Sequence, residues 1–458
     1  MGISVARSNP IEGEFDAPAS KPQTQRALIM AALADGVSTI HYPLIARETL
    51  LMLGACRSLG AEILAHDSRL EVHGIGSRFS DNTSPAGVVN PRYIWAGGSA
   101  LIARLSLAIG SALPETVIVD GNCNLRSRPF SPLLKAIQAT GAEFRFFDSR
   151  SPLPCAAVSP ALPGGHYRLG TDMSSQFITA LLIAAPIARN PSRIDVVGPG
   201  YSMSYIRQTI EMMTNFGITL KVDEETRHMQ VTHAQGYRPT SVELTGDYTS
   251  ASYILGAAFV THGNVLLRNL DPASLQGEKK IIDILTALGA KIHWIPGVNA
   301  LRADCTDLPR SVDMSFDLSD CPNILPTVAA VAAIIPGRVR ISGGRLTQHH
   351  KSHRIDAMAT ELTKAGVPVS IVRSQEGFID GLEINGKLHH GGGTQFSSHG
   401  DHRILMAMIL FALACARPCE FDGDTDTSDS FPEFTERLIQ RHLNPSPASP
   451  LEMRERIW

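Results

Sequence analysis

The chain has 458 residues, of which 43% are hydrophobic and 19% are charged, and its formal net charge is −3. A chain of this length exceeds what one ordinary hydrophobic core supports, so we expect two globular domains. The near-neutral charge offers no polybasic surface for nucleic acid. The longest apolar run, Ile404–Ala416, falls short of the roughly 20 residues that span a bilayer. We therefore expect neither a nucleic-acid partner nor a membrane partner.

The cysteines and the N-terminus favour a cytoplasmic protein. The seven cysteines are dispersed, and no two of them have C-x-x-C spacing. A disulfide framework or a zinc ribbon is therefore not expected. The first 15 residues contain no apolar stretch of the kind that a secretory signal needs. Together these features favour a reducing cytosol.

Six stretches of the chain share one pattern: a polar opening, an apolar helix of small residues, a turn and a short β-branched strand. In chain order they lie at 20–40, 97–119, 174–197, 249–267, 321–341 and 400–421. The turn residue that ends each helix recurs every 73 to 80 residues. A second helix lies between most copies and ends in a phrase such as "LGAEI" or "LGAKI", which suits a C-cap followed by a strand.

The repeat predicts an α/β fold in which each unit reads strand, helix, strand, helix, strand. Six units divide into two domains of three. We place one domain at 20–245 and the other at 1–19 plus 246–458. Because the first helix of each unit is almost wholly apolar, we expect these helices to be buried on every side.

Polar residues concentrate in the first turns of these apolar helices. They are Ser20, Lys21, Arg26, Ser99, Ser174, Ser175, Gln176, Asp320, Asn323, Asp401, His402 and Arg403. An isolated serine or aspartate at such a place is an ordinary N-cap. Cations such as Lys21, Arg26, Arg354 and Arg403 oppose the helix dipole and need an anion to offset them. The pattern therefore predicts a phosphorylated or carboxylated ligand.

The stretch "TQHHKSHRIDAMATELTKAG" places three histidines beside two cations, ahead of an amphipathic helix. Two histidines three apart can share a metal, but Lys351 and Arg354 would repel a cation. We favour an anion site that includes His350 and His353, and we assign His349 to packing or solvation. No metal or cofactor is expected.

Eight phrases of the chain form a recognisable set: "SKPQTQRAL", "LRSRPFSPL", "SSQFITALLIAAP", "SMSYI", "GDYTSASYILGAA", "HRIDAMATELTKAG", "GDHRILMAM" and "SFPEF". Together they resemble the enolpyruvyl transferases, and most closely the enolpyruvylshikimate-phosphate synthases. That family transfers the enolpyruvyl group of phosphoenolpyruvate (PEP) to shikimate 3-phosphate. The resemblance implies two domains, each of three βαβαββ units, that close over a cleft.

The resemblance assigns one set of residues to the phosphorylated acceptor: Ser174, Ser175 and Ser202 to its phosphate, Gln176 and Tyr205 to its ring, and Lys21 and Arg26 to its hydroxyl and carboxylate. Pro22 replaces a serine of the family there. Arg128, Arg354 and Arg403 remain where the family binds anions, and Asp401 and His402 are further candidate site residues.

The PEP half of the implied site departs from the family. Asn323 occupies the position of an acid–base aspartate, His350 that of a lysine and Lys351 that of a glutamate. Asp429 replaces a lysine, and Ile102 occupies a position where the family has an arginine. An amide cannot take or give a proton at neutral pH. Exchanging a lysine for Asp429 changes the charge by two units and would weaken PEP binding by on the order of several kcal/mol, of which Lys351 and the histidines would restore a part.

These departures lead us to expect an enzyme that keeps the shikimate-3-phosphate-like substrate and eliminates its phosphate without PEP, giving a cyclohexadiene acid. Lys21, His350, Lys351 or His353 would be the base. The alternative is a true carboxyvinyltransferase, in which Cys123 and Arg126 resemble the functional cysteine loop of the UDP-N-acetylglucosamine branch. A third possibility is a binding homologue without activity. We expect a monomer, with a homo-oligomer as the alternative.

Overall fold

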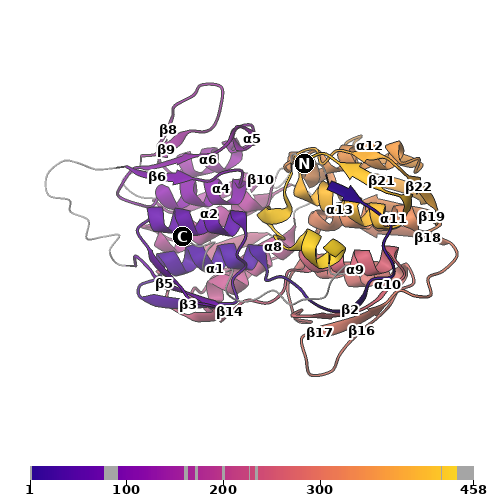
Figure 1. The fold of residues 1–458 in the computed structure, drawn as a ribbon. Coiled ribbons are helices and arrows are strands. Elements are labelled where there is room, and N and C mark those ends of the chain that lie inside the picture. The colour runs from indigo at the N-terminus through magenta and orange to yellow at the C-terminus, as the bar shows by residue number, and fades with distance from the viewer. Residues whose placement is uncertain are drawn as a thin grey trace. The chain divides into compact units, whose positions relative to one another are not determined.

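The fold is described from a computed structural model. It covers residues 3–76, 91–158, 163–170, 174–198, 202–225, 227–232, 236–423 and 425–440. These residues form two compact units, and the chain passes from one to the other after Ser20 and again after Leu244. Figure 1 shows that each unit is a layered arrangement of helices and strands.

The unit that begins at Lys21 contains three successive repeats. Its helices are α1 (Lys21–Leu33), α2 (Arg47–Ser58), α4 (Ala100–Gly110), α5 (Cys123–Arg126), α6 (Ser131–Gln138), α7 (Gln176–Ala184) and α8 (Met203–Asn215). Its strands are β3 (Val37–His41), β4 (Glu62–Ala65), β5 (Arg69–His73), β6 (Arg92–Trp95), β7 (Val117–Asp120), β8 (Phe144–Phe146), β9 (Cys155–Ala157), β10 (Gly165–Gly170), β11 (Ser192–Val197), β12 (Lys221–Asp223), β13 (His228–Val231) and β14 (Ser241–Glu243).

Those strands form three four-stranded sheets with one shared plan. Their orders are β14-β3-β5-β4, β6-β7-β9-β8 and β10-β11-β13-β12. In each sheet the first pair is parallel and the other two pairs are antiparallel. The common plan is the structural form of the sequence repeat.

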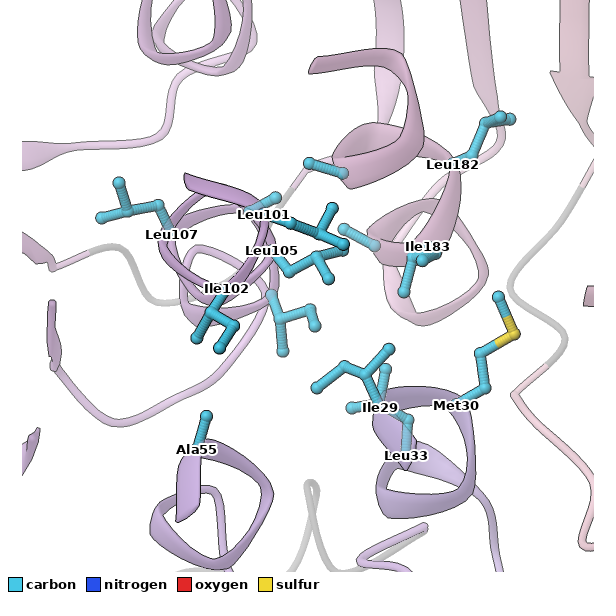
Figure 2. Close-up of a cluster of buried hydrophobic side chains, with 14 of the residues drawn as sticks. Ile29, Met30, Leu33, Ala55, Leu101, Ile102, Leu105, Leu107, Leu182 and Ile183 are labelled. Carbon is cyan, nitrogen blue, oxygen red and sulfur yellow. The ribbon is translucent and has the colours of Figure 1, made fainter. Parts of the chain in front are cut away.

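The core of this unit lies where α1, α4 and α7 meet. Figure 2 shows Ile29 and Leu33 of α1, Leu105 of α4 and Ile183 of α7 pointing toward one another. Every residue of α4 is buried. A helix with no solvent-facing stripe has to be apolar on all sides, which explains why the sequence lacks helical amphipathicity here.

The other unit contains the remaining repeats. Its helices are α9 (Tyr248–Val260), α10 (Lys280–Ala287), α11 (Leu325–Ile334), α12 (Arg354–Lys364) and α13 (His402–Leu413), with short helical turns at Gly277–Lys279, Pro322–Ile324, Arg345–His349, Thr427–Asp429 and Glu436–Gln440. Its strands are β1 (Ile3–Val5), β2 (Glu12–Asp16), β15 (Asn264–Arg268), β16 (Lys291–Trp294), β17 (Ala300–Asp304), β18 (Val312–Asp317), β19 (Gly337–Ser342), β20 (Val369–Arg373), β21 (Ile379–Gly386), β22 (His390–Gly392), β23 (Gln395–Phe396), β24 (Cys415–Arg417) and β25 (Cys419–Phe421).

Two of its sheets, β16-β17-β15-β2 and β18-β19-β21-β20, follow the same plan as the first three. The last repeat departs from it and splits into a three-stranded sheet, β1-β25-β23, and the pair β22-β24. Helices α9, α11 and α13 pack against one another in the core. Gly256 permits that packing, because a Cβ there would lie 2.9 Å from the Leu410 Cδ1 and 3.2 Å from the Thr327 Cγ2.

The first repeat of each unit is completed by a strand that is distant in the sequence. Strand β14 lies parallel to β3, with Val242 opposite Ile40. Strand β2 lies parallel to β15, with Phe15 opposite Leu267. Strand β14 comes from the C-terminal end of its unit's sequence, and β2 comes from near the N-terminus of the chain. Each of these two sheets therefore joins distant parts of the sequence.

The α/β fold with six repeats is confirmed, with two local corrections. The apolar run Ile404–Ala416 does not continue as a helix, because α13 ends at Leu413 and Cys415 starts β24. The segment Leu388–Gly400, whose glycine-rich composition is typical of a loop, contains β22 and β23. Residues 441–458 lie outside the described residues. No described helix has the length and apolarity to cross a membrane.

Replacing Leu105 by alanine should lower the free energy of unfolding by about 2–5 kcal/mol, because this buried side chain fills the centre of the three-helix core. Leu64→Ala is the matched control, since Leu64 is exposed on β4 and should cost under about 1 kcal/mol. Urea unfolding followed by circular dichroism measures both. Equal losses in the two variants would contradict this account of the core.

Candidate active site

Lys21 and Glu48 form an ion pair where α1 and α2 begin. The Lys21 Nζ lies 2.9 Å from the Glu48 Oε2, and both side chains are nearly buried. The Gln25 Nε2 donates to the Glu48 carbonyl oxygen at 3.3 Å. An ammonium group held in an ion pair is a hydrogen-bond donor. This geometry suits Lys21 to binding an anion better than to removing a proton, the role that the elimination hypothesis gives it.

Arg26 ties α1 to the first turn of α8. Its Nε donates to the Thr209 Oγ1 at 2.9 Å, its Nη2 to the Tyr205 carbonyl oxygen at 3.2 Å and its Nη1 to the Pro22 carbonyl oxygen at 3.0 Å. Ser202 is the N-cap residue of α8 and is buried. The guanidinium of Arg26 thus fixes the turn that carries two predicted site residues, Ser202 and Tyr205.

Arg104 organises the N-terminus of α7, and the sequence analysis did not select it. Its Nη1 donates to the Gln176 Oε1 at 2.7 Å and to the Ser174 Oγ at 3.2 Å. The guanidinium also lies over the Phe177 ring, 4.4 Å from its centroid. Burial, together with the charge of Arg128, lowers the pKa of Arg104 to about 9.

Arg104 also corrects an expectation about α4. The resemblance suggested that Ile102 replaces the arginine of this helix. Ile102 instead points into the core toward α2 (Figure 2). The arginine of α4 is Arg104, two residues further on. A single charged residue in an otherwise apolar helix was the signal that could have identified it, because such a charge is rarely buried without partners.

Cys123 begins α5, and Arg128 lies just after this helix. Cys123 is the first residue of α5 and is exposed. Arg126, which we expected to activate the thiol, instead makes a two-point ion pair with Asp120, at 2.6 Å and 3.0 Å. The structure therefore gives no support to activation of Cys123 by Arg126. Arg128 is half-buried, and its charge acts on Arg104.

In the other unit, Asp401 joins the beginnings of α12 and α13. The Arg354 Nε donates to the Asp401 Oδ2 at 2.8 Å, and the Arg403 amide donates to the Oδ1 at 2.9 Å. The Ser352 hydroxyl lies 3.2 Å from the same carboxylate. Burial alone would raise the pKa of Asp401, but the charges of Arg354 and His402 and these hydrogen bonds hold it well below its usual range.

Asn323 extends this cluster to a second buried carboxylate. Its Oδ1 accepts from the Arg354 Nη1 at 2.9 Å, and its Nδ2 lies 3.3 Å from the Glu278 Oε1. Asn323 is half-buried, and Glu278 is only 2% exposed. The sequence analysis did not select Glu278, and its polar surroundings in "QGEKK" gave no signal of burial.

Lys351 and Asp429 pair with each other. The Lys351 Nζ lies 2.5 Å from the Asp429 Oδ2, and the His402 Nδ1 lies 3.8 Å from the same oxygen. The resemblance places a glutamate at 351 and a lysine at 429, so this chain holds a charge pair of reversed polarity. This contact agrees with the expectation that Lys351 offsets part of the negative charge added at Asp429.

The histidines of this region differ in their surroundings. His353 is exposed, and its Nδ1 lies 3.8 Å from the Asp356 Oδ2, so its place among the candidate bases is not supported. His350 is half-buried and follows the short helix that ends at His349. His402, in contrast, is only 2% exposed, within the arginine cluster. Among the described residues, no group of three or more His, Cys, Asp or Glu side chains is placed to hold a metal ion.

Tyr253 of α9 is a buried neighbour of this cluster that the sequence analysis passed over. It is 1% exposed, and the edge of its ring packs against Phe434. Burial raises the pKa of its hydroxyl, while the nearby charges of Arg403 and Arg354 oppose that rise. A neutral phenol therefore lies beside the two arginines.

The repeated α/β architecture is the two-domain fold of EPSP synthase structures. An EPSP synthase of Acinetobacter baumannii has the same fold, with a TM-score of 0.76 and 23% identity over 96% of this chain and 97% of that one.

The family model of EPSP synthase (3-phosphoshikimate 1-carboxyvinyltransferase) matches residues 5–438. A 3-phosphoshikimate 1-carboxyvinyltransferase of Methanothermobacter thermautotrophicus is 36% identical over 441 residues, which are 96% of this chain and 98% of that protein. One of Methanothrix thermoacetophila is 33% identical over 446 residues, 97% and 99% of the two chains. The chain belongs to the EPSP synthase family.

Asp401→Ala should lower the free energy of unfolding by about 3–5 kcal/mol, because it leaves the buried Arg354 guanidinium without its carboxylate. The control is Asp313→Ala, which removes the carboxylate from the exposed Arg338 and should cost at most about 1 kcal/mol. Thermal and urea unfolding measure both changes. If the two variants were equally stable, the buried ion pair would not have the weight assigned to it.

Proposed function

We propose that the chain is an enzyme that transfers the enolpyruvyl group of PEP to shikimate 3-phosphate or a similar phosphorylated cyclic polyol. The family membership carries this proposal, because the match extends over almost the whole chain and the relatives are named as carboxyvinyltransferases. Transfer was the alternative in our reading of the sequence, and the comparisons support it better than the PEP-independent elimination favoured there.

The acceptor would bind to the unit that begins at Lys21. Ser174, Ser175 and Ser202 would hold its phosphate, while Gln176 and Tyr205 would contact its ring. The geometry around them is consistent with these roles, because buried arginines fix both turns: Arg104 holds Ser174 and Gln176, and Arg26 holds the Tyr205 backbone. Turns fixed in this way hold a ligand at a lower entropic cost than mobile ones.

PEP would bind to the cationic cluster of the other unit. Arg354 and Arg403 would contact its carboxylate and phosphate, and Lys351 would add a charge that Asp429 partly offsets. Arginine suits both anionic groups, since its planar fork donates two parallel hydrogen bonds.

Transfer requires a proton to reach the methylene carbon of PEP as the acceptor hydroxyl adds, and a proton to leave as phosphate is expelled. Asn323 supplies neither. The carboxylates of the cluster are Glu278, Asp401 and Asp429, and Asp401 is committed to Arg354. Asp429 is likewise paired with Lys351, so Glu278 is the candidate proton carrier among these three carboxylates.

Because position 323 is an asparagine, the elimination of phosphate is a second candidate function. In that reaction a base removes a proton from the allylic ring carbon on the side of the alkene away from the phosphate. The electron pair of that C–H bond forms a double bond to the neighbouring alkene carbon, the existing double bond shifts by one position toward the phosphate-bearing carbon, and phosphate leaves from that allylic carbon with the C–O electron pair. This chemistry needs a base and a cationic clamp but no PEP, so the amide at 323 would not impair it.

One assay separates the two reactions. Purified protein is mixed with shikimate 3-phosphate, with and without PEP, while phosphate release, near-ultraviolet absorbance and product mass are followed. We expect phosphate only when PEP is present, together with an enolpyruvyl ether. Phosphate without PEP, equal in amount to a conjugated diene, would establish elimination instead. No turnover under either condition would indicate a binding homologue or a different acceptor.

Ser175→Ala should weaken the binding of shikimate 3-phosphate by about 1 kcal/mol or more, the scale of a lost charge-assisted hydrogen bond. Isothermal titration calorimetry gives the change. Ser241→Ala on β14 is the matched control, since it removes the same hydroxyl from an exposed strand of the same unit. Unchanged affinity in the Ser175 variant would remove this serine from the acceptor site.

A further inference from the structure

Four side chains of one unit form a continuous hydrogen-bonded chain. It runs from Glu278 to Asn323 at 3.3 Å, from Asn323 to Arg354 at 2.9 Å and from Arg354 to Asp401 at 2.8 Å. Glu278, Arg354 and Asp401 are each at most 3% exposed. The chain joins the segment before α10 to the turn before α11 and to the beginnings of α12 and α13.

The direction of this chain follows from the chemistry of its ends. An ionised carboxylate only accepts hydrogen bonds, so the Asn323 group that faces Glu278 has to be the amide NH₂. A guanidinium only donates, so the group that faces Arg354 has to be the amide oxygen. An asparagine meets both demands at once, with its donor toward Glu278 and its acceptor toward Arg354.

We propose that Asn323 is a positioning residue that Glu278 orients and that holds the Arg354 guanidinium in place for an anionic ligand. The inference rests on the proposed function, in which Arg354 binds an anion. Asp401 holds the guanidinium through its Nε and Asn323 holds it through its Nη1, so two of its edges are fixed. A guanidinium fixed on two edges loses little further freedom when it binds.

An aspartate at position 323 would not replace Asn323 in this chain. Its oxygen would face the Glu278 carboxylate at about the present 3.3 Å, with no donor between them. Two carboxylates this close cannot both stay ionised without a large cost, and they tend to share one proton. The amide at 323 and the carboxylate at 278 are therefore a matched pair.

An exchange of the two groups tests the inference, with inorganic phosphate as the probe. Isothermal titration calorimetry on the full chain measures phosphate affinity from pH 5.5 to pH 8. Arg354→Gln identifies the part of the binding that depends on Arg354. Asn323→Asp should weaken that part about tenfold or more at pH 8. The phosphate affinity of this variant relative to that of the parent protein should recover as the pH falls, because a proton then bridges the two carboxylates.

The double variant Glu278→Gln/Asn323→Asp should bind phosphate within about threefold of the parent protein at every pH. It again pairs one amide with one carboxylate. The amide introduced at position 278 would donate to the carboxylate introduced at position 323, which would in turn accept from Arg354. Urea unfolding of each variant separates a loss of phosphate affinity from a loss of stability, because the repulsion between two buried carboxylates would also destabilise the fold.

Phosphate binding at pH 8 that Asn323→Asp leaves intact, or a double variant no better than the single one, would overturn the proposal. So would a parent protein whose phosphate binding does not depend on Arg354. These measurements need no turnover, so they are independent of the assay for enolpyruvyl transfer. The reaction could prove to be elimination while the exchange still behaves as expected.

Discussion

The burial of the central helices is the constraint that shapes both units. Helices α4, α9, α11 and α13 have almost no solvent-facing surface, so charged groups in their bodies would have to be desolvated. Polar residues therefore concentrate at the helix N-termini, where unpaired amide groups and the helix dipole favour anions. Arg104 departs from this rule, because it lies within α4 and is stabilised by two side-chain acceptors, a carbonyl oxygen and aromatic rings.

The two clusters of candidate site residues use arginine in different ways. In the unit that begins at Lys21, Arg26 and Arg104 mainly fix backbone turns and neighbouring side chains, so they prepare the residues that would contact the acceptor. In the other unit, Arg354 is itself fixed by Asp401 and Asn323. Both arrangements fix the positions of the site residues before a ligand binds. Such preorganisation can provide much of the specificity for an anion.

The departures from the family pattern are better understood as pairs than as single losses. Lys351 and Asp429 reverse the polarity of a charge pair and still contact each other. Asn323 contacts Glu278, so the amide has a carboxylate partner within the same cluster. Considered one position at a time, these residues suggest that PEP chemistry has been abandoned. The contacts between these residues instead form a rearranged cluster that keeps its cations. Such a cluster is consistent with relatives that are named as carboxyvinyltransferases.

Local patterns along the chain were enough to predict the repeat, the α/β class, the burial of the apolar helices and the gathering of cations at their N-termini, because period, composition and capping are all written in short stretches of residues. The partners became known from the folded chain alone: Glu278 for Asn323, Asp429 for Lys351, Ser174 and Gln176 for Arg104, and β14 for β3. The folded chain also separated exposed His353 from the cluster that contains His402. These contacts join residues far apart in the sequence, and no local spacing records which distant side chain fills a given hydrogen bond or desolvates a given charge.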